Sequence, residues 1–89
     1  MAWRIELTET AKKTLAKLDK PIARRLIKFL RERLAELDNP RSAGKALVGG
    51  DEQLWRYRVG DYRIIVSIED AALRILVVRI GNRREVYRR

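Results

Sequence analysis

The stretch from Trp55 to Arg63 constrains the fold most, because it reads as two strands joined by a tight turn. Gly60-Asp61 is a two-residue hairpin signal between alternating runs. Side chains alternate faces along a strand, so one face is predicted to be apolar and the other basic. The predicted apolar face holds Trp55, Tyr57, Val59, Tyr62, Ile64, Val66 and Ile68, and the opposite face holds Arg56, Arg58 and Arg63.

The basic face contains a local conflict. A two-residue turn places Arg58 directly across from Arg63, and like charges in that position destabilise a sheet. An anion among the guanidinium groups would remove the conflict, and the planar fork of arginine suits phosphate and carboxylate. We therefore interpret this face as a phosphate-binding surface. The alternative is a solvated strand face whose arginines maintain solubility.

The composition limits the classes of function. Eighty-nine residues predict one small domain, residues 1–89, and the net charge of +9 favours nucleic acid, an acidic protein or anionic lipid as partner. The sequence has no cysteine and no histidine, which excludes disulfides, Cys/His metal sites and Ser-His or Cys-His catalysis. No signal peptide and no membrane-spanning run is visible, so we expect a cytoplasmic protein without a membrane partner.

The first half of the chain predicts a strand and two helices. Trp3 to Leu7 alternates like a short half-buried strand, and Thr8 is a plausible N-cap for a helix. Asp19-Lys20-Pro21 separates this helix from a longer one, which is expected to end at Asp38-Asn39-Pro40. So short a connection predicts an antiparallel helix hairpin.

The second half predicts a loop and three strands. Arg41 to Gln53 has no sustained period and reads as a loop. Leu73 to Ile80 is almost continuously apolar, which predicts a central strand buried on both faces, with its register left open. The expected fold class is α+β, in the order β-α-α-β-β-β with a short C-terminal tail. The helix hairpin should cover one face of a mostly antiparallel sheet and leave the arginine face open.

The side chains on that face suggest a reaction. Arg83 and Tyr87 follow the central strand closely and could fold back over its end. No Asp/Glu cluster has the spacing of a two-metal nuclease. If the protein cuts a phosphodiester, we therefore expect it to do so without metal or cofactor, through attack by the RNA 2′-hydroxyl, with arginines stabilising the charge on the phosphate. Arginine is a poor base, which leaves Tyr87 as the candidate base. Tyr87 could equally stack on a nucleobase or pack on the sheet edge.

Four segments of the sequence resemble the RelE/ParE superfamily of toxins, and its RelE branch in particular. The segments are Lys45-Ala46-Leu47-Val48-Gly49, Leu54 to Ile65, Ile80-Gly81-Asn82-Arg83 and Val86-Tyr87. The resemblance implies the toxin of a type II toxin–antitoxin pair, an endoribonuclease that cuts mRNA in the ribosomal A site. It also implies a RelB-type antitoxin as partner.

The resemblance assigns roles by position. Arg63 and Arg83 match the phosphate-contacting arginines of the family, and Tyr87 matches its C-terminal catalytic tyrosine. We assign these three residues to catalysis, and Arg56, Arg58, Arg84 and Lys45 to RNA phosphate binding. Arg56 and Arg58 stand where well-known members have lysines, which preserves the charge but removes groups that titrate easily. Two alternatives are a ParE-like inhibitor of DNA gyrase and an inactive module that only binds RNA or antitoxin.

Overall fold

The computed structural model describes residues 2–47 and 53–82. The main elements are β1 (Arg4–Leu7), α1 (Glu9–Lys17), α2 (Lys20–Lys28), β3 (Leu54–Val59), β4 (Tyr62–Glu69) and β5 (Arg74–Asn82). Shorter elements are a π-helical continuation of α2 (Phe29–Leu34), 3₁₀ turns at Pro40–Ala43 and Asp70–Ala72, and strand β2 (Lys45–Ala46).

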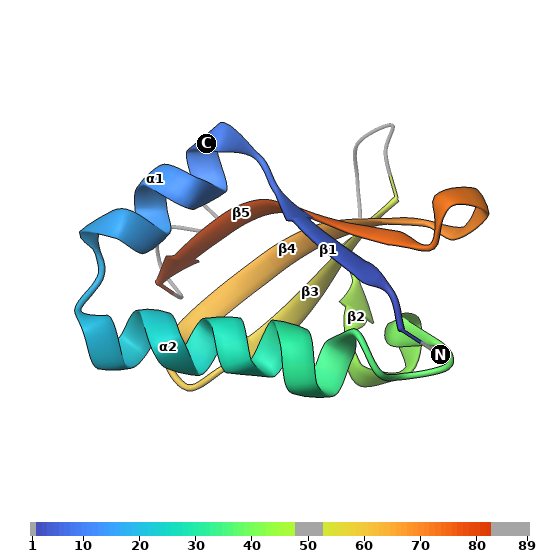
Figure 1. The fold of residues 1–89 in the computed structure, drawn as a ribbon, viewed down its shortest axis with the longest axis horizontal. Helices are drawn as coiled ribbons and strands as arrows, with labels where there is room; N and C mark the ends of the chain where they lie inside the picture. The colour runs from blue at the N-terminus through green and yellow to red at the C-terminus, as the bar shows by residue number, and fades with distance from the viewer. Residues whose placement is uncertain (1, 48–52, 83–89) are drawn as a thin grey trace.

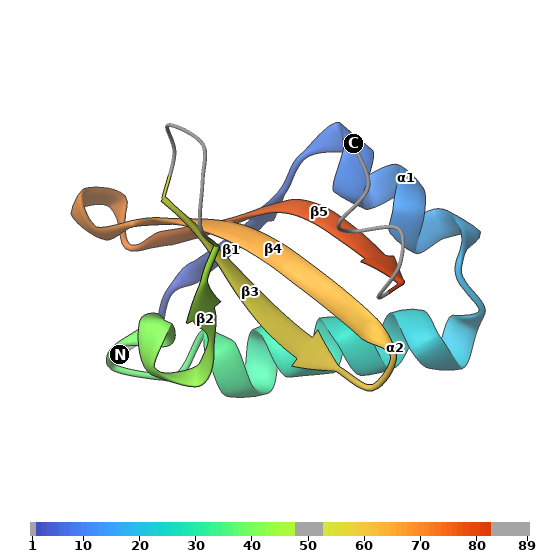
Figure 2. The same ribbon diagram turned by 180° about the vertical axis from the view of Figure 1, so that it is seen from behind.

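The strands form one five-stranded sheet in the order β1-β5-β4-β3-β2, with only β1 and β5 parallel. Both helices lie on the same side of this sheet, as the two opposite views show (Figures 1 and 2). The predicted α+β class and the mostly antiparallel sheet are therefore confirmed. β5 lies between β1 and β4, so the prediction of a central last strand is also confirmed.

The helix starts follow the local sequence. The Thr8 hydroxyl accepts a hydrogen bond from the Ala11 amide at 3.2 Å and donates one to the Val78 carbonyl at 2.9 Å, so it caps α1 and ties it to β5. Pro21 lies in the first turn of α2, where its missing amide proton costs nothing. The second helix ends at Leu34, earlier than predicted, after one wide π-helical turn.

The predicted hairpin register is confirmed. Val59 pairs with Tyr62 and Arg58 with Arg63, on either side of the Gly60-Asp61 turn. Gly60 has a φ of +60°, a left-handed conformation that glycine adopts without steric cost.

A β-bulge sets the register that the sequence left open. Val66 pairs with Val77 but Ile65 pairs with Arg79, so Val78 has no opposite residue on β4. The extra residue returns Ile80 to the face that Val77 occupies, and both are buried in the core. The neighbours Leu76 and Val78 are half-buried, so burial on both faces is incomplete.

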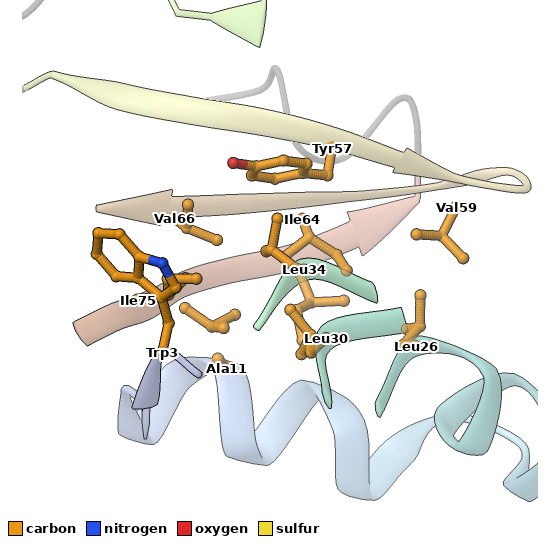
Figure 3. Packing of buried hydrophobic residues seen from close by; sticks show 12 residues of the cluster. Trp3, Ala11, Leu26, Leu30, Leu34, Tyr57, Val59, Ile64, Val66 and Ile75 are labelled. Carbon is orange, nitrogen blue, oxygen red and sulfur yellow. The ribbon is translucent and has the colours of Figure 1, made fainter. Parts of the chain in front are cut away.

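The core lies between the sheet and the helices. Leu26, Leu30 and Leu34 from the second helix pack against Tyr57, Ile64 and other sheet residues (Figure 3).

The loop predicted for Arg41 to Gln53 is partly wrong, since it contains most of a 3₁₀ turn and strand β2. Strand β2 has only two residues, which is too few for an alternating hydrophobic pattern to be recognised in the sequence.

Candidate nucleic-acid interface

The helices leave one face of the sheet uncovered, the side seen in Figure 2, and the strand pairing places several basic residues on one face. Lys45 pairs with Arg56, and Arg58 pairs with Arg63. Directly paired residues of antiparallel strands project to the same side, so all four share one face, opposite that of buried Tyr57. The predicted partition of the hairpin into an apolar and a basic face is thus present.

A hollow of about 310 Å³ opens on this face at the edge of the sheet. Its described lining residues include three cations and no carboxylate; these residues are Ser42, Ala43, Gly44, Lys45, Arg56 and Arg58. Among the described residues, Lys45 and Arg58 form no ion pair. We call this the sheet-face hollow. Its charge and its arginine forks suit a phosphate group.

Arg63 departs from the open face that the sequence predicted. Its residue surface is only 4% exposed, and its Nη1 donates to the carbonyls of Gly60 at 3.2 Å and Tyr62 at 3.0 Å. Ile65, on the same face, is also buried. Both residues lie on β4, which has neighbouring strands on both sides, whereas Arg56 and Arg58 lie on β3 near the sheet edge. The expectation of a wholly open arginine face is therefore wrong at β4.

A buried hydrogen bond fixes one wall of the hollow. The Tyr57 hydroxyl donates to the Pro40 carbonyl at 2.6 Å, which holds the Pro40–Ala43 turn against β3. Burial raises the pKa of Tyr57 to about 12, despite the opposing effect of nearby Arg41. Tyr57 is therefore a neutral structural donor, and its burial confirms the prediction that it belongs to the core.

Gly44 makes this close packing possible. A Cβ atom on Gly44 would come within 2.7 Å of Tyr57 Cε1 and 2.8 Å of the Arg56 carbonyl oxygen. The absent side chain lets the segment approach β3 closely enough for Lys45 to pair with Arg56.

An ion pair anchors the same turn from outside. The Arg41 guanidinium donates to both carboxylate oxygens of Asp70, at 3.0 and 2.6 Å, and lies 5.9 Å from the Trp55 ring centroid. The hydrogen bond to Arg41 lowers the pKa of Asp70, and the same bond raises the pKa of Arg41. The wall of the hollow is thus joined to the β4–β5 connection.

Comparisons with known proteins identify the family of this chain. The sequence model for the ParE toxin of type II toxin–antitoxin systems matches residues 5–87. Toxin RelE of Mycobacterium tuberculosis is 34% identical over 86 residues, covering 97% of this chain and 87% of that protein. The chain belongs to the RelE/ParE superfamily of type II toxins.

Solved structures of RelE-type toxins share the fold. The toxin–antitoxin complex RelBE2 of M. tuberculosis aligns with a TM-score of 0.84 at 25% identity, covering 93% of both chains. The archaeal RelE–RelB complex of Pyrococcus horikoshii aligns with a TM-score of 0.74 at 29% identity, covering 93% of this chain and 97% of that one.

Some of the predicted site residues of this toxin fall in its C-terminal segment. Arg83, Arg84 and Tyr87 lie outside the described residues. The sequence analysis also missed Arg79, which pairs with Ile65 and so lies on the basic face. The sheet face on which Arg79 lies depends on the bulge at Val78, and an almost continuously apolar stretch of sequence does not indicate where a bulge occurs. Gly44 could have been recognised from the sequence, because a glycine beside a strand often marks a close approach of two backbones.

The described part of the toxin lacks two further features. Residues 2–47 and 53–82 contain no group of three or more Asp, Glu, His or Cys side chains that could hold a metal ion. Within the same ranges, no helix is long and apolar enough to cross a membrane.

Proposed function

We propose that this toxin is a ribosome-dependent endoribonuclease that cleaves mRNA in the A site. The observation that carries the proposal is the sheet-face hollow, which Lys45, Arg56 and Arg58 line and which has no carboxylate among its described lining residues. An RNA phosphate would suit the positive charge of this lining. The relatives named RelE support the RelE-type activity over other functions of the superfamily.

In the proposed reaction, the 2′-oxygen of a nucleotide attacks the adjacent phosphorus. The O2′–P bond forms as the P–O5′ bond breaks, which leaves a 2′,3′-cyclic phosphate and a 5′-hydroxyl. Arg56, Arg58 and Lys45 would stabilise the charge that develops on the phosphoryl oxygens. Arg63, held by two backbone carbonyls, would keep a fixed position beside them.

Proton transfer needs a different residue, because guanidinium groups hold their protons firmly. We assign this step to Tyr87, whose phenolate would take the proton from the 2′-hydroxyl and pass it to the leaving O5′. Arg83 and Arg84 would be further phosphate contacts, and these assignments rest on the family resemblance. The ribosome would position the mRNA, since this small chain has few groups that could do so. Such a toxin would act in the cytoplasm, where mRNA is translated.

We further propose a RelB-type antitoxin as the partner that inhibits this toxin. The similar M. tuberculosis and P. horikoshii proteins were solved as complexes with their antitoxins. The net charge of +9 favours an acidic partner by electrostatic complementarity.

Primer extension on an mRNA under translation tests the proposed activity. We expect cuts within codons when the toxin is added, and loss of the cuts when the antitoxin is added with it. Uncut message in the presence of folded toxin would rule the activity out.

The match to the ParE model favours a second candidate, inhibition of DNA gyrase. A supercoiling assay with purified gyrase separates the two. Inhibited supercoiling together with intact mRNA would establish the second candidate in place of the first.

A further inference from the structure

A second hollow, of about 300 Å³, lies between α2 and the turn that joins β3 to β4. Figures 1 and 2 both show this turn reaching the α2 helix. Four cations and one carboxylate are among its lining residues, which are Arg25, Lys28, Phe29, Glu32, Arg33, Arg58, Val59 and Gly60. We call it the turn hollow.

The cations of the turn hollow outnumber its one carboxylate, and three of them form no ion pair within the described structure. Neither Arg25, Lys28 nor Arg33 forms an ion pair with any residue in the ranges 2–47 and 53–82. Like charges gathered around one hollow repel one another, and a bound anion would relieve that repulsion. The repulsion between like charges in the turn hollow resembles the repulsion between Arg58 and Arg63 on the sheet.

The turn itself accommodates one of these arginines. A Cβ atom on Gly60 would lie 3.0 Å from Nη1 of Arg25 and 3.4 Å from its Cζ. The guanidinium therefore lies directly against the bare glycine backbone, which positions it at the rim of the hollow. Any larger residue at this position would displace it.

Arg58 joins the two hollows. It lines both the sheet-face hollow and the turn hollow, so one positive surface continues from Lys45, across β3, to α2. A polynucleotide carries a phosphate on every nucleotide, and it can follow such a surface as a compact ligand cannot.

We propose that the turn hollow is a second phosphate subsite, which binds the RNA strand beside the phosphate held in the sheet-face hollow. The inference rests on the proposed function, since it names a further part of the same RNA site. Arg25 and Lys28 are its principal contacts, and Arg58 is shared between the two phosphates.

Fluorescence anisotropy with the full chain tests the subsite, using 2′-O-methyl RNA that cannot undergo 2′-hydroxyl attack. Two probes are compared, one of about three nucleotides and one of about eight, because only the longer should reach both hollows. The test variant is Arg25→Ser/Lys28→Ser. The control variant, Arg24→Ser/Arg31→Ser, removes the same charge from exposed positions of the same helix that line neither hollow.

The subsite predicts that the test variant binds the longer probe about 10-fold more weakly, while the control variant stays close to wild type. The slope of log affinity against log salt should fall by about 0.7 for each lost phosphate contact, for the longer probe only. Binding of the short probe should be unchanged in both variants.

Equal losses in both variants would mean a diffuse charge effect and would overturn the subsite. An unchanged affinity for RNA, with lost affinity for an acidic peptide, would assign the hollow to a protein partner and would also overturn it. Cleavage of translated mRNA by wild-type toxin is measured separately. Intact message there refutes the proposed function, whereas normal cleavage with equal losses in both variants refutes the subsite alone.

Discussion

At the scale of single residues, Arg58 shows that the hairpin is not arranged for stability alone. It pairs directly with Arg63, which is buried and donates to two carbonyls, so the repulsion cannot be relieved by Arg63 turning into solvent. An anion next to both arginines would offset the repulsion between them. A residue kept for binding at the expense of stability has a recognisable signature, because its removal affects the two properties in opposite directions.

Replacing Arg58 with alanine should leave the free energy of unfolding unchanged or raise it by about 0.5 kcal/mol, because a like-charge pair is removed. The same change should lower the rate of mRNA cleavage by about 100-fold or more, since one stabilising donor is lost. Urea denaturation and single-turnover cleavage measure the two effects. Val59→Ala, a neighbour on the buried face, is the control and should lose about 2 kcal/mol of stability. Strong destabilisation by Arg58→Ala would contradict the binding role.

Tyr57, in contrast to Arg58, stabilises the folded protein. Its hydroxyl and the Pro40 carbonyl satisfy each other in the interior, so Tyr57→Phe should cost about 1–2 kcal/mol of stability at neutral pH by leaving the carbonyl without its donor. Chemical denaturation of the two proteins measures the difference.

The pH dependence of that difference has a definite sign. The pKa of Tyr57 is raised to about 12 in the folded state, so between about pH 10 and pH 12 the unfolded chain loses a proton that the folded chain keeps. The stability advantage of wild type over Tyr57→Phe should be constant below about pH 10 and shrink above it. An advantage that grows with pH would contradict the buried, neutral phenol.

At the scale of elements, the hairpin was predictable and the segments beside it were not. The Gly60-Asp61 turn fixed the β3–β4 register from local sequence alone, and every predicted pair near the turn is present. The bulge at Val78 and the two-residue strand β2 depend on contacts with residues distant in the sequence, so no local sequence pattern predicts them. The burial of Arg63 follows from the place of β4 inside the sheet, which is a property of the strand order.

The Pro40–Ala43 turn and β2 act together as one wall of the sheet-face hollow. Gly44→Ala should disturb this wall, because the new methyl group meets a fully buried ring and a backbone oxygen that cannot move aside cheaply. We expect a loss of about 1–3 kcal/mol in stability and weaker RNA binding through displacement of Lys45. Denaturation and anisotropy measure both effects. Ala43→Gly, which adds no atoms next to Gly44, serves as the control, and full RNA affinity in Gly44→Ala would mean that Lys45 has no part in binding.

At the scale of the whole molecule, the helices and the basic face of the hairpin lie on different sides of one sheet, and the positive surface reaches α2 around the β3–β4 turn. The helices α1 and α2 bury the apolar face and complete the core, which leaves the other face and the turn to carry charge. This division explains how a chain of 89 residues with a net charge of +9 can fold stably around one core. The sequence predicted the division because the alternation in the hairpin separates the two faces, while the candidate residues after Asn82 stay predictions.

The most direct test of the account is cleavage of translated mRNA by the variant Arg56→Ser/Arg58→Ser, with ribosome binding measured by co-sedimentation in the same samples. We predict that the variant still sediments with ribosomes and resists urea as wild type does, yet cuts the message at least about 1,000-fold more slowly. Cleavage at the wild-type rate by this folded, ribosome-bound variant would contradict the claim that the basic sheet face holds the RNA phosphate.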